Sequence, residues 1–310
     1  DIYLILRNAR WFPTFGYVKS RSWGYPLYEL FAYPLVAYFG ELAGKIYSWL
    51  WAVVGALFFA LSVKAKMGRD FSMPDLALRV ALFCVLPLTL ISANSLLETS
   101  QGVALALGAL YFFLIEEMTW AWFFGGAALA LRPDYAIFLT SFAIAQWSVG
   151  RFYRKYAYAF AGALVAGFCF YPLFYGSEAV ATYPISILQT GDPLPMRVIK
   201  AFLGWVGQFG VLGWLWVGVG LLGSWKVLRW KSRFGVFLLS ASAFYVVRLL
   251  ILPDELEYAY PLAACWLLAI ATAREGWFGR ASWLNGFLAA LVSSKIFLPT
   301  IFYREPATGE

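Results

Sequence analysis

The lysines and arginines of this chain gather in four short clusters, and one cluster falls at every second turn between long apolar segments. Loops on the cytoplasmic side of helical membrane proteins carry an excess of Lys and Arg, so the alternation predicts an orientation for every loop. The loops between the clusters hold carboxylates, which indicates that chemistry requiring carboxylates lies on the outer face. The clusters are Lys64, Lys66 and Arg69; Arg151, Arg154 and Lys155; Lys226, Arg229, Lys231 and Arg233; and Arg274 and Arg280.

Composition supports a membrane protein. Of the 310 residues, 62% are hydrophobic and only 13% are charged, which is too few ionic groups to cover a water-soluble protein of this size. Apolar stretches of roughly 17 to 25 residues recur along the chain, the length that a helix needs to cross a bilayer. The alternation typical of a membrane barrel is absent. The sequence therefore predicts an all-α, polytopic transmembrane bundle with about ten membrane helices.

Two of the predicted membrane segments, 119–131 and 134–149, are short for a full crossing, which predicts helices that are broken at this point or flanked by a pocket in a thinned membrane. All ten segments are 42–63, 73–92, 98–115, 119–131, 134–149, 156–175, 201–225, 234–252, 257–273 and 281–298.

The chain divides into three parts. Cations and prolines interrupt residues 1–41, so we expect an outer loop with interfacial helices there. Residues 42–298 form the predicted transmembrane domain, which includes the long outer loop 176–200, and residues 299–310 form a tail. The loop trace places Asp1 outside, so we expect a first membrane helix upstream of it, or else a cleaved signal peptide.

Several functional classes are disfavoured. The net charge of +7 arises mainly in short loops beside apolar segments, which argues against nucleic acid as a partner and for contact with membrane lipids. The chain has no histidine, so a histidine base and a zinc site are excluded, and acid–base chemistry must use carboxylates. Cys84, Cys169 and Cys265 lie in apolar segments and are interpreted as packing residues.

The opening segment carries the most specific motif of the chain. Its residues Asp1, Tyr3, Ala9, Arg10, Gly16, Gly24, Tyr25 and Pro26 resemble the first outer loop of the GT-C superfamily of membrane glycosyltransferases. In that family an Asp just after the first membrane helix is followed by a tyrosine-bearing helix, an Ala-Arg pair, a glycine-containing turn and a Gly-Tyr-Pro return to the membrane. The family often has a second acidic residue beside the first, where this chain has Ile2.

Two further stretches extend the resemblance. Residues 125–133, Gly-Gly-Ala-Ala-Leu-Ala-Leu-Arg-Pro, are similar to a glycine- and alanine-rich helix that ends in a cationic residue and proline. Residues 253–261, Pro-Asp-Glu-Leu-Glu-Tyr-Ala-Tyr-Pro, resemble the acidic, tyrosine- and proline-containing start of a late helix in mannosyltransferase branches of the family.

The resemblance implies a reaction. A sugar, expected to be a hexose and first of all mannose, would pass with inversion from a polyprenyl or dolichyl phosphate to a hydroxyl of a glycan, lipid or protein acceptor. Asp1 would act as the base, because an ionised carboxylate in a cleft can take the proton of the acceptor hydroxyl. Arg248, together with Arg132, would stabilise the departing phosphate through its fork of N–H donors. No cofactor is required by this mechanism, and no metal site is predicted, although a divalent ion is compatible with it.

Each candidate has an ordinary structural alternative. Asp1 could be a solvated residue at a frayed end. Arg132 and Arg248 could extend to lipid headgroups from the ends of their apolar segments. Glu98 begins an apolar segment, where an acid pairs with a cation or a polar ligand, or else caps a helix.

The remaining candidates are equally open. Tyr25 could stack on a sugar or belong to the aromatic belt of the membrane interface. Asp254, Glu255 and Glu257 could bind sugar hydroxyls or a divalent ion, or form a solvated acidic loop. Asp134 follows Pro133 and is expected to cap the next helix.

Two rival functions use the same features. A transporter or flippase of an amphipathic anion would bind substrate through the intramembrane arginines without breaking a bond. A subunit with the GT-C fold but without activity would need no cleft at Asp1. In every case we expect an integral membrane protein, first of all in a prokaryotic plasma membrane with its site facing outside, with the endoplasmic reticulum as the alternative.

Overall fold

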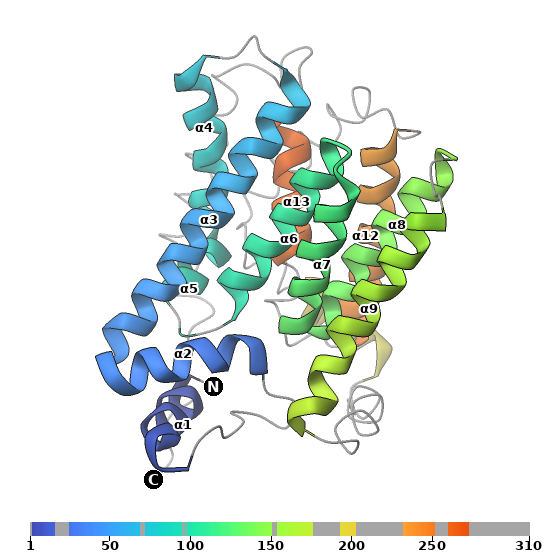
Figure 1. The fold of residues 1–310 in the computed structure, drawn as a ribbon. Helices are drawn as coiled ribbons and strands as arrows, with labels where there is room; N and C mark the ends of the chain where they lie inside the picture. The colour runs from blue at the N-terminus through green and yellow to red at the C-terminus, as the bar shows by residue number, and fades with distance from the viewer. Residues whose placement is uncertain are drawn as a thin grey trace.

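The computed structural model of the protein describes residues 2–15, 25–68, 72–94, 96, 98–150, 154–175, 193–202, 232–251 and 260–272. Every regular element in these ranges is helical and none is a strand, which confirms the all-α prediction for this part of the chain (Figure 1). The elements are α1 (Ile2–Phe15), α2 (Pro26–Phe39), α3 (Glu41–Met67), α4 (Met73–Cys84), α5 (Pro87–Asn94), α6 (Thr99–Leu114), α7 (Met118–Leu131), the short 3-10 helix η1 (Pro133–Tyr135), α8 (Ala136–Ser148), α9 (Arg154–Tyr175), α12 (Arg233–Ile251) and α13 (Tyr260–Ala271). A further helical segment covers 194–202.

Most of the predicted membrane segments coincide with these helices, but few of the helices are long. Within the described residues, α3 and α12 are long and apolar enough to cross a membrane, and the bent pair of α4 and α5 is a third candidate. Helices α6, α7 and α13 are apolar but shorter. The predicted segment 281–298 and nearly all of 201–225 lie outside the described residues.

The predicted membrane segment 73–92 is bent in its middle. Helix α4 ends at Cys84, α5 begins at Pro87, and the two axes differ by 70°. Proline lacks the N–H that would continue the helical hydrogen bonds, and its ring collides with the preceding turn, so Pro87 explains the break.

The longest helix, α3, owes its limits to two glycines. Gly40 and Gly68 both have φ of 83°, a conformation that glycine adopts without steric cost, and the Gly68 N–H donates to the Lys64 carbonyl. Glu41 lies in the first turn, and Lys64 and Lys66 lie in the last turn. A negative charge at the start of a helix and positive charges at its end interact favourably with the helix dipole.

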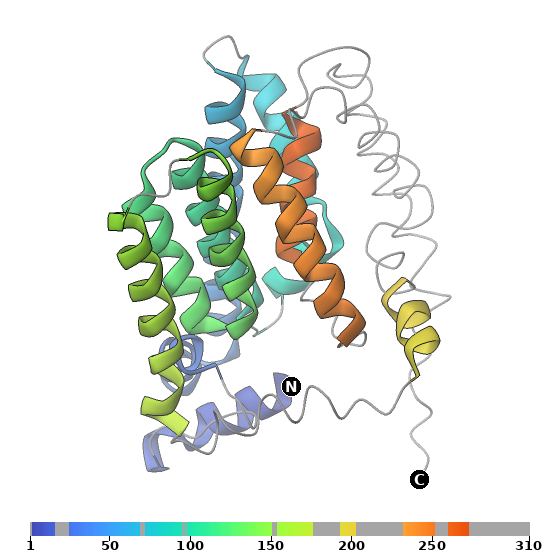
Figure 2. The same cartoon turned by 90° about the vertical axis from the view of Figure 1, so that its right-hand side faces the viewer.

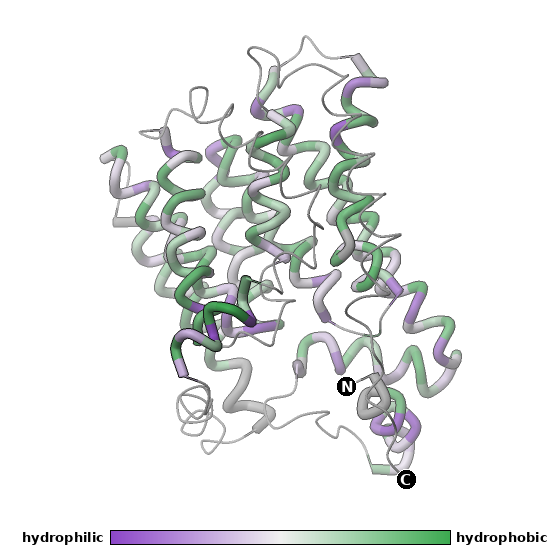
Figure 3. Tube along the Cα trace, turned by 180° about the vertical axis from the view of Figure 1, so that it is seen from behind, coloured by the Kyte–Doolittle hydropathy of each residue, from purple (hydrophilic) through white to green (hydrophobic). Residues whose placement is uncertain are grey.

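Small residues let the central helices approach closely. A Cβ atom added at Gly55 of α3 would lie 3.6 Å from Ala104 of α6, and one at Gly126 of α7 would lie 3.2 Å from Ala163 of α9. Such interfaces are typical of membrane helices, where close backbone packing replaces the hydrophobic effect as a source of attraction. Figure 3 shows that the helices of the bundle are hydrophobic over most of their length.

Successive helices of the bundle run in alternating directions, so their termini gather at two ends (Figures 1 and 2). Helices α1 and α2 lie across one end, beside the start of α6 and the end of α7, and we call this the first-loop end. The opposite end contains the end of α3, the α6–α7 turn and the start of α12. We call it the basic end, because Lys66 and Arg233 lie there.

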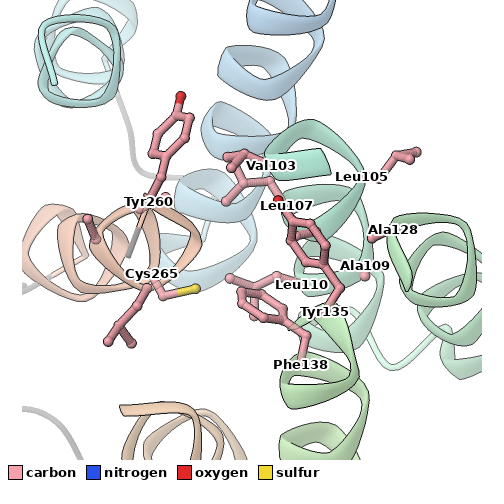
Figure 4. Close-up of a cluster of buried hydrophobic side chains, with 14 of the residues drawn as sticks. Val103, Leu105, Leu107, Ala109, Leu110, Ala128, Tyr135, Phe138, Tyr260 and Cys265 are labelled. Carbon is pink, nitrogen blue, oxygen red and sulfur yellow. The ribbon is translucent and has the colours of Figure 1, made fainter. Parts of the chain in front are cut away.

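Between the two ends lies an aromatic and aliphatic core. Figure 4 shows Tyr135 and Phe138 among Leu107 and Leu110 of α6. The Tyr135 side chain fits there because residue 102 is glycine: a Cβ at Gly102 would lie 2.6 Å from the Tyr135 hydroxyl oxygen.

Candidate functional site

A buried arginine at the first-loop end is the centre of the candidate site. Helix α7 ends at Leu131, and Arg132 is extended, with φ −148° and ψ 130°. Proline disfavours the helical conformation for the residue before it, so Pro133 explains why the helix stops here. Pro133 then begins η1, and the Tyr135 N–H donates to the Arg132 carbonyl. The predicted break between 119–131 and 134–149 is therefore confirmed.

Two carboxylates contact the Arg132 side chain. Its Nη1 lies 3.3 Å from Oε1 of Glu98, and its Nε lies 3.0 Å from Oδ1 of Asp134. All three side chains are at most 1% exposed. We call Glu98, Arg132 and Asp134 the Arg132 cluster.

The ion pairs decide between the alternatives for these residues. Glu98 makes no capping hydrogen bond at the start of α6, so it pairs with a cation as its depth in an apolar segment predicted. Arg132 turns inward and does not reach toward lipid headgroups. The expected capping role of Asp134 is wrong, because its Oδ1 accepts a hydrogen bond from Arg132 Nε instead.

Buried ion pairs of this kind seldom add much stability, because removing the charges from water costs several kcal/mol for each ion. Once the three side chains are buried, however, removing one of them leaves a buried charge without its counter-charge. Two carboxylates share one guanidinium, so these three side chains carry a net charge of about −1 at neutral pH.

The first loop rests on the Arg132 cluster. The Tyr25 ring, just before α2, lies with its centroid 5.9 Å from the Arg132 Cζ atom. Burial raises the pKa of the Tyr28 hydroxyl, and the nearby Glu98 carboxylate adds to the shift, so Tyr28 is neutral. Helix α1 in turn contacts α2 through the rings of Phe12 and Tyr33, whose centroids are 6.4 Å apart. Tyr25 belongs to the Gly-Tyr-Pro motif, and Tyr28 follows Tyr25 by three residues.

Several buried oxygens beside the cluster have unused hydrogen-bonding capacity. Oδ2 of Asp134, the Thr99 hydroxyl and the Tyr245 hydroxyl are buried and have no hydrogen-bond partner in the structure as described. The Tyr245 ring contacts Phe138, which follows Asp134 by four residues, with ring centroids 6.0 Å apart. These groups are of the kind that bind hydroxyl-rich ligands.

Arg248 lies at the same end of the bundle, in the last turn of α12, and is 9% exposed. It follows Tyr245 by three residues, so both side chains lie on the same face of α12. That face packs on α8, where the rings of Phe138 and Tyr245 have centroids 6.0 Å apart. Figure 2 shows α12 descending toward the first-loop helices.

The other predicted site residues cannot be placed. Asp1, Asp254, Glu255 and Glu257 lie outside the described residues, as do residues 176–192 of the long outer loop. Within the described ranges, no group of three or more acidic or cysteine side chains is arranged to hold a metal ion.

Sequence reasoning missed the tyrosines of the site. Tyr135 and Tyr245 lie among aromatic core residues and carry no local signal, whereas the run Arg132-Pro133-Asp134 was visible as a unit. Comparison of the chain with protein families, with curated proteins and with solved structures finds no match. Interpretation of the site therefore depends on its geometry and on the motifs of the sequence.

Proposed function

We propose that this chain is an integral membrane glycosyltransferase of the GT-C type, which transfers a sugar from a polyprenyl phosphate to an acceptor hydroxyl with inversion. The observation that carries the proposal is the burial of Glu98, Arg132 and Asp134 beneath Tyr25 at the first-loop end. Two of the sequence motifs behind the resemblance, the first loop and the Arg-Pro segment, thus belong to one end of the bundle, and Arg248 lies at the same end.

We assign Arg132 a positioning role. Two carboxylates already surround its guanidinium, so its charge is more than balanced and it is poorly suited to neutralise a phosphate. It lies instead under the Tyr25 ring, where it fixes the first turn of α2. Through α2 and the Phe12–Tyr33 contact it holds α1, whose first residue follows Asp1.

Arg248 is the proposed phosphate ligand. It lies in the last turn of α12, and its fork of donors suits the two oxygens of a leaving phosphate. Asp134 Oδ2 and the Tyr245 hydroxyl, one turn deeper in the bundle, would accept and donate hydrogen bonds to sugar hydroxyls.

The reaction balances without a further reagent. The Asp1 carboxylate takes the proton of the acceptor hydroxyl while the hydroxyl oxygen attacks the anomeric carbon. The bond from that carbon to the phosphate oxygen breaks, and the lipid phosphate leaves with its electron pair beside Arg248. Attack and departure on opposite faces invert the anomeric centre. Asp254, Glu255 and Glu257 are proposed to contact the donor or acceptor sugar.

The membrane and its side follow from the same proposal. The first-loop end would face the outside of a prokaryotic plasma membrane, or the lumen of the endoplasmic reticulum, and the basic end would face the cytoplasm. The helical bundle with its two or three candidate spans supports a membrane location but not a choice of membrane.

A transfer assay tests the proposal. The full chain is supplied with polyprenyl-phosphate mannose and glycan or lipid acceptors. We expect Asp1→Asn to abolish turnover while donor binding is retained, since only the base is lost. We expect Arg248→Gln to weaken donor binding at least tenfold, and Lys45→Gln, a half-exposed cation of the same end, to leave it unchanged.

The rival functions give different results in this assay. Donor bound and moved across a vesicle membrane without cleavage would identify a transporter. If the chain neither binds the donor nor transfers the sugar, it is a non-catalytic subunit. Unchanged turnover in Asp1→Asn would remove the base assignment.

A further inference from the structure

The basic end of the bundle contains a second arginine with unusually well-defined contacts. Arg233, the first residue of α12, donates from Nη2 to the Phe113 carbonyl at 2.7 Å and to the Leu114 carbonyl at 3.5 Å. Its Cζ atom lies 4.8 Å from the centroid of the Phe113 ring. These carbonyls lie in the last turn of α6, where the Phe113 carbonyl also accepts from the Glu116 N–H at 3.3 Å, so Arg233 adds a cap supplied by another helix.

A lysine lies beside this arginine. The Lys66 Nζ atom is 4.9 Å from the centroid of the Phe234 ring, and Phe234 directly follows Arg233 in the chain, so the two cations are neighbours. Lys66 is an exposed residue at the end of α3. Aromatic rings thus hold two cations in fixed positions at a point where the cations repel each other.

The nearby acidic residue balances only part of this charge. Glu116, in the α6–α7 turn, approaches Arg233 with Oε1 3.4 Å from Nη1, and its side chain is 58% exposed. Lys66, Arg233 and Glu116 together carry a charge of about +1, and Glu117, the next residue of the turn, is a second exposed carboxylate. Arg233 is also preceded in the sequence by Lys226, Arg229 and Lys231, and Lys64 is exposed in the last turn of α3.

Exposed apolar side chains lie at the start of α7, at the same end of the bundle. Next to the Glu116 turn, the side chains of Trp120 and Phe123 on α7 are 51% and 62% exposed. A chain of ring contacts links them to α3, from Trp120 to Phe112 at 6.0 Å and from Phe112 to Phe58 at 6.3 Å. Exposed Trp beside apolar side chains is typical of the level at which lipid headgroups meet acyl chains.

We infer that Lys66 and Arg233 bind the phosphate of an anionic membrane lipid at the basic end. The phosphate lies between the two cations, where it relieves their repulsion, and the acyl chains lie along the exposed side chains of α7. Glu116 remains beside Arg233 or turns to water, which its exposure permits. The lipid would stabilise the joint between α3, the α6–α7 turn and α12. This site does not depend on the proposed glycosyl transfer.

Lipid binding to the purified full chain tests the inference. The protein is kept in micelles containing either phosphatidylglycerol or phosphatidylcholine, and bound lipid is counted by native mass spectrometry. We expect retention of phosphatidylglycerol over phosphatidylcholine, and a loss of about fivefold in its apparent affinity in Lys66→Gln, which corresponds to about 1 kcal/mol for one cation at a lipid surface.

Two further variants and one further probe make the test decisive. Lys45→Gln, at the other end of α3, should retain phosphatidylglycerol as the wild type does, because Lys45 pairs with Glu41 at 2.7 Å. Arg233→Gln should lose at least as much affinity as Lys66→Gln, and Lys66→Gln remains informative if the cap variant fails to fold. Equal binding of the two lipids by the wild type, or an equal loss in Lys45→Gln, would overturn the inference. Displacement of the lipid by millimolar inorganic phosphate would assign the site to a free anion instead.

Discussion

The two ends of the bundle use arginine in opposite ways. At the first-loop end, Arg132 is sealed from solvent and contacts two carboxylates, so the local charge is negative. At the basic end, Arg233 caps the carbonyls of α6, keeps 14% of its side chain exposed and has Lys66 beside it, so the local charge is positive. The same side chain is a buried structural centre in one place and part of an open anion-binding surface in the other.

The number and exposure of the carboxylates around each guanidinium separate the two arginines. Arg132 is enclosed by two buried carboxylates and has little left to offer an anionic ligand, whereas Arg233 contacts carbonyls and one exposed carboxylate. The assignment of Arg132 to positioning and of Arg233 to a phosphate group follows from this distinction. Matched changes at the two ends test it.

The largest effect is expected for Arg132→Met, since it leaves Glu98 and Asp134 buried without their cation. We expect a loss of about 3–5 kcal/mol in the free energy of unfolding, measured by denaturant titration in mild detergent. The matched change Arg233→Met should cost about 1–2 kcal/mol, because the carbonyls and Glu116 can turn to water. Equal losses at the two ends would contradict the distinction between them.

A smaller but clear effect is expected for Glu98→Gln. The amide keeps the shape of the side chain but removes one of the two charges that hold Arg132, and we expect a loss of about 2 kcal/mol. Increased cleavage by protease within residues 16–24 should accompany it if the Arg132 cluster holds the first loop. Unchanged protease sensitivity would separate the cluster from the first loop.

Gly102→Ala tests the packing of Tyr135 beside the cluster. The new Cβ would lie 2.6 Å from the Tyr135 hydroxyl oxygen and 2.8 Å from a ring carbon, so the ring must move. We expect a loss of about 1–3 kcal/mol in the free energy of unfolding. The control is Gly162→Ala in α9, where a Cβ meets no atom within 4 Å and should stabilise the helix by up to about 1 kcal/mol. A destabilised Gly162→Ala would show that the effect is not specific to the site.

The smallest effect is expected for Glu116→Gln at the basic end. Its ion pair with Arg233 is exposed, so we expect a change below about 1 kcal/mol that disappears in high salt. In the same variant, phosphatidylglycerol should bind more tightly, because the local positive charge increases. Weaker lipid binding would argue against Lys66 and Arg233 as the phosphate ligands.

Local patterns explain how much of the fold could be predicted. Apolar segments bounded by charges predicted the positions of α3, α6, α7 and α12, because membrane-length apolar runs are a local property of the chain. The bend at Pro87 was equally local and was overlooked. The depth of Glu98 predicted that it would have a partner, but not which one, since Arg132 lies 34 residues further along the chain and reaches it only through the packing of α6 on α7.

The tyrosines and the basic end depended still more on tertiary structure. The α6–α7 turn, residues 115–117, contains no cation of its own, yet α12 supplies Arg233 to Glu116. Tyr245 carries no motif, and its position beside the cluster follows from the packing of α12 on α8. Pairing between distant segments leaves no local trace in a single sequence.

The short Arg-Pro-Asp run has one more consequence. Arg132 and Asp134 belong to the same turn of chain and travel together, whereas Glu98 belongs to the start of α6. A sliding movement of α6 against α7 would therefore stretch one ion pair and spare the other, and the guanidinium would never be stripped of both counter-charges at once. The contact between α6 and α7 would then loosen in two stages, with the Glu98–Arg132 ion pair lost before the Arg132–Asp134 ion pair.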